Sequence, residues 1–97
     1  MKLYYVYILA HKPFGALYVG LTNDIYERTR QHKLRVGSKH ASKYSITMLV
    51  YYEEFDDHHD AFLRERQIKK YRREWKINLI ESMNPEWNDL FREWKED

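Results

Sequence analysis

One carboxylate stands on what would otherwise be the apolar side of a helix. Glu65 follows Ala61 by four positions and Phe62 by three, and Ile68 comes three positions later. Side chains at this spacing share one helix face, and a carboxylate that faces a core is costly unless it is paired or binds a metal ion. Two interpretations stand at this point, a divalent-metal ligand or the acidic partner in a structural ion pair.

A second group of residues combines an arginine, a histidine and two tyrosines. Arg28 and His32 are four residues apart and share a helix face with Ile25,. Arginine binds two phosphate oxygens at once, and histidine exchanges a proton near neutral pH. A tyrosine such as Tyr7 or Tyr18 acts as a base only if its pKa falls from about 10. These types suit phosphodiester chemistry, but an ordinary amphipathic helix beside packed strands would show the same pattern.

Positive charge is concentrated in one segment, although the formal net charge is only +2. The segment 66–76 contains Arg66, Lys69, Lys70, Arg72, Arg73 and Lys76, opposed only by Glu74. A basic segment followed by an acidic C-terminal stretch predicts contact with a polyanion in one place. The alternative is a solvated charged helix.

Length and composition exclude several classes of protein. The 97 residues suffice for one domain, which we expect to span residues 1–97,. The absence of cysteine excludes a disulfide scaffold, a thiolate nucleophile and cysteine-based zinc sites,. No apolar run approaches the roughly 20 residues that cross a bilayer. We therefore expect a cytoplasmic protein with no membrane partner.

The pattern of the first half predicts a hairpin, a helix and a third strand. Residues 3–9 and 16–19 read as strands around turn chemistry at 11–15,. A register symmetric about that turn places Tyr7 directly opposite Tyr18. Residues 22–24 form an N-cap cluster for a helix that ends at Gly37-Ser38, and residues 46–52 should form the third strand,.

The second half predicts helices. Asp56 and Asp57 can cap a helix that begins near His58 and that is expected to bend or break at residues 69–73,. A further apolar face, ending at Asn84-Pro85, contains Trp75, Leu79, Ile80 and Met83. A last short helix is expected to contain Trp87, Leu90, Phe91 and Trp94,. The order β-β-α-β-α-α predicts an α+β domain with a three-stranded, mostly antiparallel sheet flanked by helices.

In combination, these positions resemble the GIY-YIG nuclease superfamily. Tyr5-Val6-Tyr7 stands where the family name reads GIY, and Tyr18-Val19-Gly20 is a variant of YIG, with ten residues between the two triplets. Arg28 and His32 follow in the R-x-x-x-H pattern, and Glu65 lies in a helix similar to the one with the family's metal-binding glutamate,. Tyr5 replaces the glycine of the first triplet.

The ending of the chain adds to the resemblance. Residues 84–90 are similar to the end of a small standalone bacterial subgroup, related to the nuclease domain of the excision-repair incision subunit. Leu21 stands where the excision-repair relatives have a lysine. The resemblance covers essentially the whole chain and implies the GIY-YIG endonuclease fold.

The resemblance implies a metal-dependent endonuclease that hydrolyses a phosphodiester bond of DNA, in repair or recombination. One Mg²⁺ or Mn²⁺ ion would be held by Glu65, with no small-molecule cofactor. Arg28 would bind the non-bridging phosphate oxygens. Tyr7 would be the base with Tyr18 assisting, or the two roles would be exchanged, and His32 would relay a proton or hold a tyrosine hydroxyl.

Further residues would support this site or bind the DNA. Gly20 and Asn84 are expected in supporting positions. The DNA backbone would contact Lys43, Lys69, Lys70, Arg72, Arg73 and Lys76.

Two other functions remain open from the sequence. One is a nucleic-acid-binding module with this fold and little or no cleavage activity. The other is a protein-interaction domain that uses an exposed aromatic C-terminus made of Trp87, Phe91 and Trp94.

Overall fold

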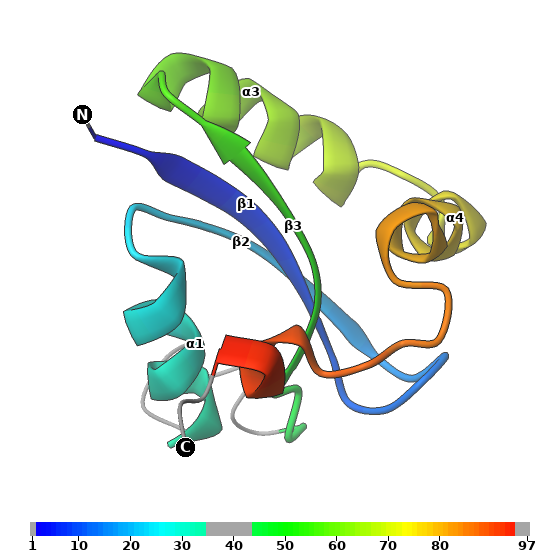
Figure 1. The fold of residues 1–97 in the computed structure, drawn as a ribbon. Coiled ribbons are helices and arrows are strands. Elements are labelled where there is room, and N and C mark those ends of the chain that lie inside the picture. The colour runs from blue at the N-terminus through cyan, green and yellow to red at the C-terminus, as the bar shows by residue number, and fades with distance from the viewer. Residues whose placement is uncertain (1, 35–43, 95–97) are drawn as a thin grey trace.

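The computed structural model describes residues 2–34 and 44–94. Its elements are β1 (Tyr4–Ala10), β2 (Leu17–Thr22), α1 (Ile25–Lys33), β3 (Met48–Phe55), α3 (His58–Lys69), α4 (Arg73–Met83) and the 3-10 helix η1 (Leu90–Trp94). The predicted α+β class and the order β-β-α-β-α-α are confirmed. Figure 1 shows α3 and α4 on one side of the sheet, and α1 and η1 on the other.

The sheet has the strand order β2-β1-β3, and both pairings are antiparallel. The predicted register of the hairpin is wrong, because Tyr7 lies opposite Gly20, and Tyr18 lies opposite Leu9. The loop runs from His11 to Ala16, closed by a backbone hydrogen bond of 3.0 Å between them. It is therefore centred one residue later than expected. Tyr18 still shares a face of the sheet with Tyr7. It lies two residues before Gly20, the partner of Tyr7, and residues two apart on a strand point to the same face,.

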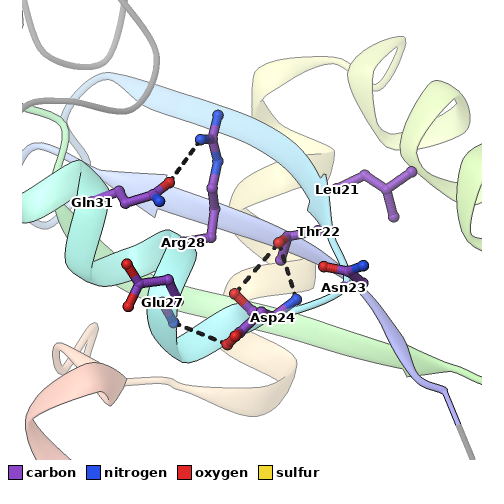
Figure 2. A pocket seen from close by; sticks show the side chains of 7 residues that line it. All are labelled: Leu21, Thr22, Asn23, Asp24, Glu27, Arg28 and Gln31. Atoms are coloured by element: carbon purple, nitrogen blue, oxygen red, sulfur yellow. Dashed lines mark hydrogen bonds between the residues drawn. The ribbon is translucent and has the colours of Figure 1, made fainter.

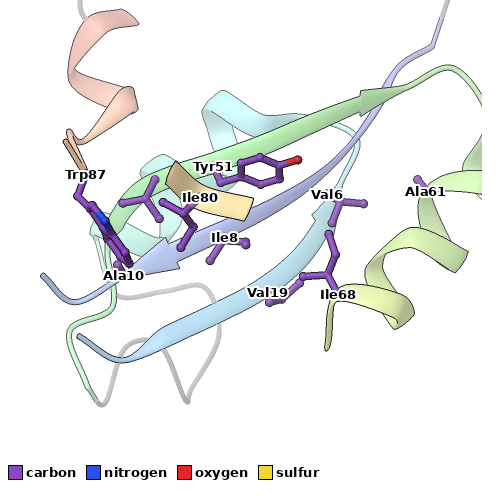
Figure 3. Packing of buried hydrophobic residues seen from close by; sticks show 10 residues of the cluster. Val6, Ile8, Ala10, Val19, Tyr51, Ala61, Ile68, Ile80 and Trp87 are labelled. Atoms are coloured by element: carbon purple, nitrogen blue, oxygen red, sulfur yellow. The ribbon is translucent and has the colours of Figure 1, made fainter. Parts of the chain in front are cut away.

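Alternation along β1 divides the core between the two faces of the sheet. Val6, Ile8 and Ala10 belong to the cluster beneath α3 and α4, which Figure 3 shows together with Ile68 and Ile80. On the opposite face, the buried residues are Tyr7, Leu9, Ile46, Leu49 and Phe91. The first strand is buried on both faces because it is the central strand.

The predicted helix starts are confirmed. Asp24 caps α1 by accepting a hydrogen bond of 3.1 Å from the Glu27 backbone, and Asp57 caps α3 by accepting one of 3.0 Å from Asp60,. The break within residues 69–73 is also confirmed, because α3 ends at Lys69 and α4 begins at Arg73. By contrast, α1 ends at Lys33, before the predicted end at Gly37-Ser38, which lies outside the described residues.

Several side chains expected in the core are exposed. The exposed fraction is 38% for Phe62, 46% for Trp75 and 44% for Met83. The helix α3 instead buries Ala61 and Ile68, and the small Ala61 side chain permits a close approach to the sheet. The sides of α3 and α4 that carry Phe62, Trp75 and Met83 therefore lie at the margin of the contact with the sheet or outside it.

The C-terminal segment differs from the predicted helix. Trp87 has a left-handed backbone, with φ of 57°, and precedes the shorter helix η1. Trp87 and Phe91 are nevertheless buried and Trp94 is half-buried, so these aromatics pack on the domain. The strand β3 also begins at Met48 and continues to Phe55, beyond the predicted 46–52. No helix in the described part of the chain is long and apolar enough to span a bilayer.

Candidate active site

A buried hydrogen bond joins the first strand to the first helix. The hydroxyl of Tyr7 lies 3.1 Å from Nε2 of His32, and each residue is only 1% exposed. Burial, with the positive charge of Arg28, lowers the pKa of His32 to about 4,. The imidazole is therefore neutral at pH 7. Its Nδ1 atom is buried and has no hydrogen-bond partner within residues 2–34 and 44–94.

The guanidinium of Arg28 lies near the same tyrosine. The pKa of Arg28 is raised, first by its interaction with the Tyr7 hydroxyl, while burial acts in the opposite direction and Tyr18 adds to the rise. The Tyr7 hydroxyl, which is hydrogen-bonded to His32, therefore also lies close to the positive charge of Arg28.

Gln31 is a contact of this site that the sequence analysis missed. Nη1 of Arg28 donates a hydrogen bond of 3.1 Å to Oε1 of Gln31, one helical turn further on (Figure 2). The i, i+3 spacing of an arginine and a glutamine on one helix was the available signal. Both side chains line an open pocket of about 440 Å³ between α1 and the end of β2. The arginine is thus half-buried but borders a space that a ligand can enter.

The two tyrosines differ in their access to water. The Tyr18 ring is half-buried, with its centroid 6.4 Å from the Tyr7 ring and 5.3 Å from the His32 ring. Tyr7 is fully buried, and burial raises its pKa to about 12, with Arg28 acting in the opposite direction. The negative charge of Glu65 contributes to the rise. Tyr7 is therefore protonated at neutral pH.

Gly20 makes room for the Tyr7 ring. The two residues are direct partners on β1 and β2, and a Cβ atom built on Gly20 would lie 2.4 Å from Cζ and Oη of Tyr7. Such distances lie inside the van der Waals contact. The glycine in the second triplet is therefore required by the close approach of this tyrosine rather than by its own backbone angle.

Glu65 is mostly buried but is not isolated. Its side chain is 14% exposed, and Oε2 lies 3.1 Å from Nζ of Lys69, one turn further along α3. The ion pair with Lys69 supports a structural role for Glu65. A role as metal ligand also keeps support, because the negative charge of Glu65 acts on Tyr7 and therefore lies near the tyrosines. Within the described residues, no three Asp, Glu, His or Cys side chains converge on one point. The donor set therefore fits Mg²⁺ or Mn²⁺ completed by water and phosphate oxygens, rather than an ion enclosed by protein ligands.

The helix that contains Glu65 is fixed to β3 by its neighbour. Nη2 of Arg64 lies 2.8 Å from Oε2 of Glu53, and Nη1 lies 3.2 Å from the Tyr71 hydroxyl. The Tyr51 hydroxyl also donates a hydrogen bond to Glu53. Burial opposes ionisation of Glu53, but Arg64 and Tyr51 outweigh it, so its pKa is lowered. This network sets the position of α3 relative to the sheet.

The end of α1 is anchored in a similar way. Nζ of Lys33 lies 2.6 Å from Oδ2 of Asp89 and donates a 3.1 Å hydrogen bond to the Thr47 carbonyl. The other carboxylate oxygen of Asp89 accepts a hydrogen bond of 3.2 Å from the Leu49 backbone. Because Arg28 and His32 lie on α1, this contact helps to hold both against the sheet.

Asn84 connects β3 with the C-terminal segment. Its Nδ2 atom donates to the carbonyls of Val50 and Asn88, at 3.1 and 2.8 Å, and its Oδ1 atom accepts a 3.0 Å bond from the Asn88 backbone. The side chain is buried and engaged with backbone at both ends. These contacts explain Asn84 as a support of the fold.

The basic residues predicted to meet DNA are not equivalent. Lys69 is paired with Glu65, and Arg73 donates hydrogen bonds to the carbonyls of Phe14 and Gly15. Arg72 lies 5.0 Å over the Trp75 ring. Lys70 is exposed and Lys76 half-buried, and neither forms an ion pair within the part of the chain that the structure describes. Lys43 lies outside the described residues.

Similar proteins support the family that the sequence suggests. A UPF0213 protein of Clostridium perfringens is 40% identical over 78 residues, which are 80% of this chain and 83% of that protein. One of Haloquadratum walsbyi is 38% identical over 78 residues, covering 80% of this chain and 86% of the relative. A UPF0213 protein of Staphylococcus saprophyticus is 38% identical over 80 residues, which are 82% of this chain and 96% of that protein.

A solved structure and a family model extend the comparison. The solution NMR structure of the UPF0213 protein from Bacillus halodurans has the same fold, with a TM-score of 0.57 and 24% identity, covering 97% of this chain and 99% of that one. The family model described as the GIY-YIG catalytic domain matches residues 3–78. That match spans all the strands of the sheet and every residue of the site from Tyr7 to Glu65. The chain therefore belongs to the GIY-YIG family.

Proposed function

We propose that this chain is a metal-dependent endonuclease that hydrolyses a phosphodiester bond of DNA, in cytoplasmic DNA repair or recombination, with residues 1–97 as a single domain. The observation that carries the proposal is the position of Arg28, which is hydrogen-bonded to Gln31, lies near Tyr7 and lines an open pocket. Family membership supports the substrate class, because this domain belongs to nucleases. The geometry adds a fixed positive charge where a phosphate can enter.

Arg28 binds the scissile phosphate in this proposal. Its guanidinium donates a hydrogen bond to the Gln31 amide and is half-buried near Tyr7, so less conformational entropy is lost when it meets two phosphate oxygens,. A preorganised positive charge also stabilises the charge that develops on the non-bridging oxygens during attack.

The burial of the tyrosines favours the exchanged assignment of their roles. Tyr7 is 1% exposed and has a pKa of about 12, so it suits the positioning of Arg28 better than contact with a water molecule. Tyr18 is half-buried on the same face of the sheet and is the tyrosine that water can reach. We therefore assign Tyr18 to the attacking water and Tyr7, with His32, to holding the arginine.

Glu65 is the residue that would hold the metal ion. A bound Mg²⁺ or Mn²⁺ supplies Lewis-acid stabilisation of the phosphate and of the leaving oxygen. Because the same carboxylate is paired with Lys69 at 3.1 Å, a bound ion would compete with the Lys69 ammonium, which could then contact a neighbouring phosphate. The DNA backbone continues along Lys70, Arg72 and Lys76, whose charges give a salt-sensitive contact.

One observation favours a second function, a nucleic-acid-binding module with weak or no cleavage activity. The glutamate is paired with Lys69 at 3.1 Å rather than free to hold a metal ion. A site fixed in that state would bind phosphate through Arg28 without completing the reaction. The two functions differ in one measurable property, which is metal-dependent cleavage.

Cleavage of supercoiled plasmid tests the proposal. The purified protein is incubated with magnesium, manganese or EDTA, alongside Arg28→Ala and Glu65→Gln. The expected result is metal-dependent conversion to nicked circles that falls roughly 100-fold or more in both variants. Glu86→Gln is the matched control, because Glu86 is an exposed carboxylate outside the proposed site.

Branched and flapped DNAs extend the same test. Nicking that persists in Glu65→Gln would contradict the assignment of the metal ligand. Binding to all of these DNAs without cleavage of any, in either metal, would instead support the binding module. Circular dichroism of each variant establishes that the fold is retained.

A further inference from the structure

A second pocket lies on the same face of the sheet as Tyr7, beside the start of α1. Its volume is about 360 Å³, and it is lined by Tyr5, Ile25, Tyr26, Tyr52, Glu54 and Trp94. Tyr5 and Glu54 are direct partners on β1 and β3. The first turn of α1 separates this space from the Arg28 pocket, because Ile25 and Tyr26 line one while Glu27 and Arg28 line the other.

The aromatic side chains form walls at steep angles to one another. The Tyr5 and Tyr52 rings lie 6.3 Å apart with an interplanar angle of 68°, and Tyr52 and Trp94 lie 5.5 Å apart at 61°. Tyr26 is held in place by the Phe91 ring at 4.9 Å but remains 45% exposed. The rings of Tyr5, Tyr52 and Trp94 thus form edge-to-face pairs along one side of the pocket,.

The charge of the lining residues favours a positively charged ligand. Of the six lining residues only Glu54 is charged, and it is exposed at the rim. Burial and the negative charge of Glu54 raise the pKa of Tyr5. The pocket thus combines aromatic side chains with a carboxylate, and among residues 2–34 and 44–94 no cation lines it.

From these features we propose that the pocket of Tyr5, Tyr26, Tyr52, Glu54 and Trp94 binds an organic cation, either a quaternary ammonium or a guanidinium group. Such cations are attracted by the faces of several aromatic rings at once. The carboxylate of Glu54 adds a charge partner at the rim. Tyr5 contributes one wall from the position where the GIY triplet has glycine, so the site depends on a residue in which this chain departs from that triplet.

A stacked nucleobase fits the pocket less well. A base would stack on these rings, but its phosphate would then approach Glu54, and none of the described lining residues is a cation that could receive it. Aromatic platforms that bind single strands combine stacking with a basic groove. The charge of the lining therefore favours the cation.

The proposal is tested with choline and its uncharged analogue 3,3-dimethylbutan-1-ol, which has the same shape. Binding is followed by NMR through the indole Nε1–H signal of Trp94, assigned with the Trp94→Phe variant. Choline is expected to shift this signal and to bind roughly tenfold more tightly than the alcohol. N-acetyl-trimethyllysine amide and N-acetyl-arginine amide are titrated in the same way, to distinguish a free cation from a protein side chain.

Variants separate the charge effect from general apolar binding. Glu54→Gln is expected to weaken choline binding roughly fivefold and to leave the alcohol unchanged, while Glu74→Gln, far along the sequence on α4, should alter neither. Equal affinities for choline and the alcohol would overturn the proposal. So would a shift caused by deoxynucleosides but by none of the cations at concentrations up to roughly 100 mM.

Discussion

The ring of Tyr7 lies against the backbone of Gly20, so that a Cβ atom at residue 20 would come within 2.4 Å of the tyrosine Cζ and Oη atoms. The two residues are partners on neighbouring strands. This contact places the Tyr7 hydroxyl next to His32 and Arg28.

Substitution of the glycine should displace the tyrosine. Gly20→Ala is expected to lower the free energy of unfolding by roughly 1–3 kcal/mol, because the new methyl group overlaps the Tyr7 ring. Denaturant unfolding measures this loss. In a Tyr7→Ala background the same substitution should cost much less, because the overlapping ring is gone. An equal loss in both backgrounds would show that the close approach to Tyr7 is not the cause.

The buried histidine should make stability depend on pH. The pKa of His32 falls to about 4 in the folded protein from its usual 6.5, so the unfolded chain binds more protons between these values,. The stabilisation from neutral His32 is therefore fully present above about pH 6.5 and is lost as the pH falls toward 4. Its size is at most about 3 kcal/mol.

Denaturant unfolding at several pH values checks this dependence. His32→Gln cannot titrate, so its stability should fall less than that of the unsubstituted protein between about pH 7.5 and pH 4.5. His59→Gln, which alters an exposed histidine, is the control and should follow the unsubstituted protein. Parallel curves for all three proteins would exclude a lowered pKa for His32.

Gln31 should act as a positioning residue for Arg28. Gln31→Leu removes the acceptor of the 3.1 Å hydrogen bond, and nicking is expected to fall roughly tenfold,. Gln31→Glu restores an acceptor oxygen and should recover most of that loss, which a purely structural role would not produce. Cleavage rates at saturating DNA measure both variants. Equal rates for Gln31→Leu and the unsubstituted protein would remove Gln31 from the site.

Substitution of Arg73 and substitution of Lys70 should have different effects, although both residues belong to the basic segment 66–76. Arg73 donates to two carbonyls of the hairpin loop, so Arg73→Ala is expected to cost about 1 kcal/mol of stability,. Lys70 is exposed, and Lys70→Ala should leave stability unchanged while lowering the salt dependence of DNA binding by roughly one ion,. Unfolding curves and binding at several salt concentrations measure the pair. Loss of stability in Lys70→Ala but not in Arg73→Ala would contradict the assigned contacts.

Local features of the chain could be predicted because they depend on neighbours in sequence. Asp24 and Asp57 cap their helices through hydrogen bonds to residues three positions on, and the break before Arg73 also lies where it was expected. The spacing of Arg28 and His32 placed both on the face of α1 that meets the tyrosines. The order of strands and helices along the chain likewise followed from hydrophobic patterning.

Tertiary structure decided what depends on distant contacts. A shift of one residue in the loop centre changed the partner of Tyr7 from Tyr18 to Gly20, because register follows the geometry of the turn,. Whether an apolar helical residue is buried depends on how closely the helix approaches the sheet, and so Phe62 is exposed beside buried Ala61. The sequence by itself determined the element types, the helix caps and the set of reactive side chains. Only the tertiary structure decided which of them touch, because a contact between β1 and α1 depends on the packing of both on one sheet face.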